Sequence, residues 1–93
     1  MTEREMIPVL ERVVEAAEAL PALVRGGGDD RPRRHYIEGA REYFDVGEWL
    51  LSYEELMYLA EAWPAFEADH KDDLDALDTY FVAAKARAFP SEH

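Results

Sequence analysis

Hydrophobic and polar positions recur along most of the chain at the spacing of an α-helix. The first apolar face consists of Met6, Leu10, Val13, Ala17 and Leu20, widened by Ile7 and Val14. Thr2 and Glu5 have the spacing of a capping box. Pro8 is tolerated only in the early turns of a helix, so we expect the regular helix to be established near this residue. Pro21 disfavours helical geometry at the residue before it. The pattern predicts a first helix over about residues 4–20, with residues 22–25 as an optional further turn.

Three consecutive glycines, residues 26–28, then predict a loop. Asp30 is placed to cap a second helix, with Pro32 in its first turn. That helix is expected over about residues 33–45, and Gly47 follows its end as a left-handed C-terminal residue. Its expected buried residues are Tyr36, Ile37, Ala40, Tyr43 and Phe44.

The third helix is predicted over about residues 48–63, because Pro64 must end it. Two starts are open: Glu48 begins the helix directly, or Ser52 and Glu55 form a capping box that starts it later. Its expected core residues are Leu56, Leu59, Ala60 and Trp63, joined by Trp49, Tyr53 and Met57. Two tryptophans and two tyrosines exceed what one face of a short helix can bury, so some of these rings should be exposed.

A fourth helix is predicted over about residues 69–88, with acidic residues in its first turns and basic ones in its last, as the helix dipole favours. Its apolar stripe is Leu74, Leu77, Phe81, Ala84 and Ala88, and residues 91–93 are expected to fray. No strand pattern occurs. The predicted fold is therefore all-α: one domain over residues 1–93, a compact four-helix bundle, with three helices as the alternative.

Composition excludes several classes of protein. The 93 residues contain no cysteine, so disulfides and thiolate sites are absent. Apolar runs are far shorter than the roughly 20 residues of a membrane span, and no secretory signal opens the chain, so we expect a cytoplasmic protein.

Charge is strongly segregated along the chain. Residues 42–78 hold twelve acids and only one basic residue, Lys71. This segment therefore accounts for the whole formal net charge of -11. Such a surface repels nucleic acid and anionic membranes and favours a basic partner. Three arginines, Arg33, Arg34 and Arg41, stand out in the second helix. RNA contact is one interpretation, and pairing with the acidic half of the same molecule is the favoured one.

The sequence offers little support for catalysis or cofactor binding. The glycine loop lacks the Gly-Lys-Ser/Thr of a phosphate-binding loop. Glu67 and His70 have the spacing of one carboxylate-bridged metal motif, but such sites need two copies. The two serines, Ser52 and Ser91, suggest no triad. We expect no enzyme activity, no metal and no cofactor.

The segment over residues 40–61, AREYFDVGEWLLSYEELMYLAE, combines a helix end, a glycine, acids and aromatic rings. It resembles the central signature of MafI-like immunity proteins of bacterial polymorphic toxin systems. That signature is a helix ending in Tyr-x-x-x-Gly-Glu-Trp/Tyr, followed after two or three residues by Ala-x-Glu-x-Leu. The residues that match are Tyr43, Gly47, Glu48, Trp49, Glu54 or Glu55, and Leu56.

The resemblance implies a cytoplasmic antidote that binds and neutralises a cognate toxin domain. A basic nuclease fits the charge best, because an acidic face can occupy its substrate groove. The expected contact residues, on the third and fourth helices, are Glu48, Trp49, Glu54, Glu55, Tyr58, Asp72, Asp73 and Asp75. Glu48 and Trp49 are also signature residues, so their alternative role is to hold the helix junction. The free protein is expected to be a monomer or weak homodimer.

Two alternatives belong to other functional classes. The first is a regulatory or scaffolding bundle that self-associates through exposed aromatic rings and has no toxin partner. The second is an acidic mimic of DNA that regulates a transcription factor. A self-associating bundle should have a symmetric apolar patch, whereas an antidote should bind one basic partner in a salt-sensitive way.

Overall fold

The structure is a computed structural model that describes residues 1–21 and 31–88. These residues form five helices and no strand, which confirms the all-α class. The helices are α1 (Glu3–Glu18), α2 (Arg31–Asp45), α3 (Trp49–Ala62), α4 (Pro64–Asp69) and α5 (Lys71–Ala88). None of these five helices is long and apolar enough to cross a membrane.

The helix count differs from the prediction at one place. Residues 64–69, expected to connect two helices, form α4, because Pro64 ends α3 but is well suited to the first position of a new helix. Asp69 ends α4, so α5 begins at Lys71 rather than near residue 69. The expected turn at residues 22–25, the glycine loop, the Asp30 cap and the frayed tail lie outside the described residues.

Helix α1 is the central helix of the fold and contacts α2, α3 and α5. Its predicted apolar face is confirmed at Met6, Leu10, Val13, Val14 and Ala17, which are fully buried. Ile7 and Leu20 are half-buried, and Leu20 lies beyond the helix, which ends at Glu18 rather than near residue 20. The predicted capping box is present, since Thr2 and Glu5 exchange hydrogen bonds of 2.9 and 3.3 Å. This cap lets the helix begin at Glu3, before Pro8 rather than at it.

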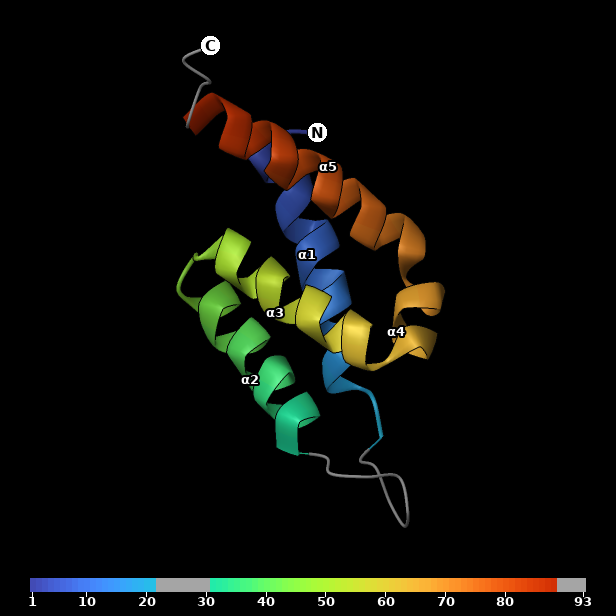
Figure 1. Cartoon of the computed structure of the whole chain (residues 1–93). Coiled ribbons are helices and arrows are strands. Elements are labelled where there is room, and N and C mark those ends of the chain that lie inside the picture. The colour runs from blue at the N-terminus through green and yellow to red at the C-terminus, as the bar shows by residue number, and fades with distance from the viewer. Residues whose placement is uncertain (22–30, 89–93) are drawn as a thin grey trace.

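Two helical units cover α1 (Figure 1). Helices α2 and α3 form an antiparallel hairpin on one side, and α5 crosses α1 on another, with α4 leading the chain from the hairpin to α5. The predicted stripe of α5 is confirmed at Leu74, Leu77 and Phe81, which are buried, while Ala84 is half-buried and the side chain of Ala88 is outside the described part of the structure. In α2 only Ala40 of the predicted set is fully buried, while Tyr36, Ile37, Tyr43 and Phe44 are half-buried.

The turn between α2 and α3 is determined by local sequence. Gly47 has a φ of +79°, and it donates to the Phe44 carbonyl at 3.1 Å, while Glu48 N–H donates to the Tyr43 carbonyl at 2.9 Å. These bonds form a Schellman motif, which confirms the predicted role of the glycine. Glu48 is the residue before α3, so the later start at Ser52 is wrong.

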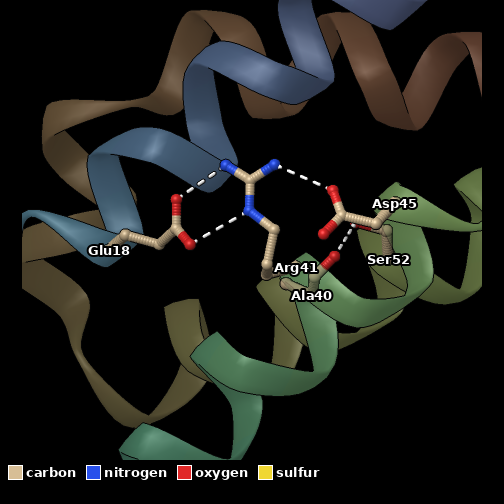
Figure 2. Close-up of polar contacts among 5 residues, drawn as sticks. All are labelled: Glu18, Ala40, Arg41, Asp45 and Ser52. Carbon is tan, nitrogen blue, oxygen red and sulfur yellow. Dashed lines mark hydrogen bonds and ion pairs between the residues drawn. The ribbon is translucent and has the colours of Figure 1, made fainter.

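Ser52 instead lies inside α3 and faces α2. Its hydroxyl is fully buried and donates a 2.7 Å hydrogen bond to the Ala40 carbonyl (Figure 2). A small side chain at this position lets the two helix backbones approach, and the hydrogen bond satisfies the polar atom that is buried as a result.

A single arginine, Arg41, links α2 to α1 through its carboxylate partners (Figure 2). The Arg41 guanidinium donates to both oxygens of Glu18 at 2.7 and 3.0 Å and to Asp45 at 3.1 Å. The hydrogen bond with Glu18 is the main reason that the pKa of Arg41 lies above its usual value. Arg41 is thus paired within the molecule, as the favoured interpretation of the arginines expected, although Glu18 lies outside the acidic half.

Replacing Ser52 tests the α2–α3 contact. We expect Ser52→Ala to lower the free energy of unfolding by about 1 kcal/mol, because a buried hydrogen bond is lost. Thr79→Ala is the matched control, since the Thr79 hydroxyl bonds the Asp75 carbonyl at 3.0 Å on the exposed surface. Urea unfolding of the three proteins measures both effects, and equal losses for the two variants would contradict this account.

Candidate partner-binding face

The eight residues predicted to contact a partner occupy three different environments. Glu48 and Trp49 lie at the junction of α2 and α3. Glu54, Glu55 and Tyr58 lie along α3, and the three aspartates lie in the first turns of α5. Their exposure and their internal partners separate the residues that are free to bind from those that hold the fold together.

At the junction, Trp49 has a structural environment. Its indole Nε1–H donates to Glu3 of α1 at 3.1 Å, and its ring meets Phe44 edge-on with centroids 5.2 Å apart. Glu48 is exposed, and its side chain makes no capping hydrogen bond. These contacts favour the junction-holding role for Trp49 and leave the Glu48 carboxylate open to solvent.

On α3, Tyr58 is exposed and Glu54 is half-exposed, while Glu55 lies against α2. Tyr58 is 50% exposed, and its ring packs against Tyr36. Glu55 lies over Gly39, where an added Cβ would come within 3.1 Å of the Glu55 carboxyl carbon. One carboxylate oxygen of Glu55 is buried there without a hydrogen-bond partner among the described residues. The prediction of exposed rings is confirmed at Tyr58, whereas Tyr53 is 5% exposed.

On α5 the three aspartates differ in their partners. Asp73 receives two hydrogen bonds from Arg12 of α1, at 2.8 and 2.9 Å. Asp75 pairs with Lys71 one turn earlier at 3.4 Å. Asp72 is exposed and has no hydrogen bond or ion pair within the described chain. Asp73 therefore fastens α5 to α1, while Asp72 and Asp75 remain available.

A groove joins α3, α4 and α5 next to these acids. Its volume is about 210 Å³, and its lining residues are Tyr53, Met57, Glu67, Lys71, Leu74, Asp75 and Asp78. The Tyr53 hydroxyl donates to Asp78 at 3.1 Å, and the Tyr53 ring stacks on Phe81. Burial, and then the Asp78 and Asp75 carboxylates, hold the pKa of Tyr53 well above its usual value.

Of the residues that line this groove, only Asp75 is among the contact residues predicted from the sequence. Two spacings in the sequence are signals for the rest of the groove. Met57 lies one helical turn after Tyr53, and Asp78 lies three residues after Asp75. Periodicity cannot show which flank of α5 meets α3, so these residues could not be assembled into one site from sequence.

A larger groove of about 390 Å³ lies between the end of α1 and α2. Three arginines and three glutamates line it together with Leu20 and Ile37. Its charges balance, and Arg41 is occupied by Glu18 and Asp45, so it offers no preference for an ion of either sign. Among the residues that the structure describes, no group of three or more acids and histidines could hold a metal ion.

The Arg12–Asp73 pair predicts a pH-dependent contribution to stability. Hydrogen bonding to Arg12 lowers the pKa of Asp73 below its usual value of 3.8. A depressed folded-state pKa stabilises the protein above the unfolded-state pKa, and the effect is lost as the pH falls through the folded-state value.

We therefore expect Asp73→Asn to lower the free energy of unfolding at pH 7 by about 0.5–1 kcal/mol, with the difference from wild type shrinking as the pH falls from about 5 to 3. Urea midpoints across this range measure the effect. Asp72→Asn, at the neighbouring position in the same helical turn, removes a carboxylate that has no ion pair among the described residues and contributes only through the helix dipole, so its pH-dependent loss should be smaller. A loss for Asp73→Asn that stays constant with pH would contradict the role of the pair.

No family model matches this chain, and no curated protein or solved structure is significantly similar to it.

Proposed function

We propose that this protein is an immunity protein that binds and neutralises a cognate toxin domain, and that this toxin domain is a basic nuclease. The observation that carries the proposal is a set of acidic side chains on α3 and α5, most of which have no ion pair among the described residues, together with the exposed ring of Tyr58. Its exposed or half-exposed members are Glu54, Tyr58, Asp72 and Asp75. The likeness of residues 40–61 to the MafI-like signature supports the same function.

Unpaired acids of one sign repel each other, which opposes the stabilisation that Asp72 gains from the dipole of α5. Within the described chain, Glu54 and Asp72 make no ion pair, and Asp75 is matched only by an exposed lysine. A basic partner would remove this repulsion and accelerate its own association. Tyr58 adds a rigid, half-exposed ring, the kind of side chain that contributes most binding energy at interfaces.

Three of the expected contact residues contribute less to this proposal, the first being Glu55, which lies against Gly39 of α2 with one carboxylate oxygen buried. Trp49 and Asp73 already have partners in α1, namely Glu3 and Arg12. Their replacement would disturb the fold before it disturbed an interface. We therefore assign the binding face chiefly to Glu54, Tyr58, Asp72 and Asp75, with Glu48 at its edge.

The direct test is co-expression of this chain with the C-terminal domain of the protein that is encoded immediately upstream of it. We expect rescue of growth and a stoichiometric complex that purifies intact. The chain without its partner should be a monomer or weak homodimer by light scattering. Absence of both rescue and complex, with a stable dimer, would instead support the self-associating bundle, which the exposed Leu51, Tyr58 and Val82 favour.

The contribution of the acidic face is tested on that complex. We expect Glu54→Gln, Asp72→Asn and Asp75→Asn together to slow association about tenfold at low salt, with a smaller effect at high salt. The matched control replaces Glu11, Glu15 and Glu38, three exposed acids on α1 and α2, with glutamine. Stopped-flow association rates that fall equally for both triple variants would show that net charge, rather than this face, guides the encounter.

A further inference from the structure

The groove between α3, α4 and α5 has an apolar floor and an acidic rim. Tyr53 and Leu74 are almost fully buried and Met57 is half-buried, so these three side chains form the floor. Glu67, Asp75 and Asp78 are exposed around it, together with Lys71. At about 210 Å³ the groove is smaller than the roughly 300–1,000 Å³ pockets that hold drug-sized ligands.

The rim already contains one cation of the chain itself. The Lys71 ammonium lies 3.4 Å from Asp75, and both side chains are 66% exposed. A solvent-exposed pair at this helical spacing contributes little and exchanges readily. Asp78 is held by the Tyr53 hydroxyl, and Glu67 has no ion pair among the described residues. Three carboxylates and one weakly held ammonium therefore line the rim, which leaves it with a net negative charge.

We propose that this groove receives a single lysine or arginine side chain of the protein partner, whose cationic group displaces Lys71 from Asp75. Long basic side chains place their methylene stems on apolar surface while the charged group stays in a polar environment. The floor of Tyr53, Met57 and Leu74 fits the stem, and Glu67 and Asp75 fit the charged group. The inference rests on the proposed function for the identity of the partner, but its chemistry can be tested separately.

The probe is a short soluble peptide with one central arginine between alanine and leucine residues, compared with the same peptide carrying neutral citrulline. Titration into the isotopically labelled protein, followed by NMR, should shift signals of Tyr53, Met57 and Leu74 with the arginine peptide only. Glu67→Gln with Asp75→Asn should weaken this binding about fivefold. Lys71→Gln should strengthen it, because the internal competitor is removed.

Glu11→Gln with Glu15→Gln, at two exposed positions of α1, is the control of equal charge change and should alter binding little. Asp78 is left intact because it bonds Tyr53. Shifts spread evenly over the acidic surface, equal weakening by the control pair, equal binding of the citrulline peptide, or no binding would each overturn the proposal. So would a concentration-dependent dimer that fills the groove with a second copy of the chain.

The two proposals can fail independently. Arginine-specific shifts at the groove without toxin rescue would retain the groove and reject the immunity function. Rescue and a stable complex that Glu67→Gln, Asp75→Asn and Lys71→Gln leave unchanged in affinity would retain the immunity function and reject the groove.

Discussion

Burial of the apolar stripe of α1 is the constraint on which the rest of the structure depends. Five of its side chains are fully removed from solvent, and three other helices supply the surfaces that cover them. Truncation of one large buried aliphatic residue typically costs about 2–5 kcal/mol, a large part of the stability of a domain this small. The α2–α3 hairpin and α5 are therefore held in place mainly by their shared contact with α1, and polar contacts then fix their register. Arg41 with Glu18 does so for α2, and Arg12 with Asp73 does so for α5.

The close approach of α2 and α3 explains why aromatic residues reach the surface. Ala40 and Ser52 are small and fully buried at this contact. Space between the helices is then filled by backbone, so the larger rings are displaced to the flanks. Tyr53 turns toward α5 and stacks on Phe81, whereas Tyr58 packs on Tyr36 and stays half-exposed. One helix thus supplies both a core ring and a surface ring at positions only five residues apart.

The same packing divides the acidic residues by role. Asp73 and Glu18 pair with arginines across helix interfaces, and Asp78 accepts a hydrogen bond from a buried tyrosine. Glu54, Asp72 and Glu67 have no such partner in the described chain. The acidic residues look alike in the sequence. In the folded protein they divide into a first set of structural acids and a second set without a structural partner. The proposed binding face and the proposed groove use members of the second set together with Asp75, which pairs only with the exposed Lys71 among the described residues, and the groove also includes Asp78.

The sequence by itself determined the helical class, the buried face of α1, the stripe of α5 and the glycine turn at Gly47. These features depend on residue spacing and local backbone chemistry, which act within a few turns of one helix. It also located the excess of acid. Three features required the tertiary structure: the start of α3, the helix at residues 64–69 and the inward direction of Ser52. The two possible starts of α3 both satisfy local rules, and only packing against α2 selects between them. The groove required it as well: Met57, Glu67 and Asp78 come from three helices, and the packing of those helices around α1, which no local pattern encodes, brings them together.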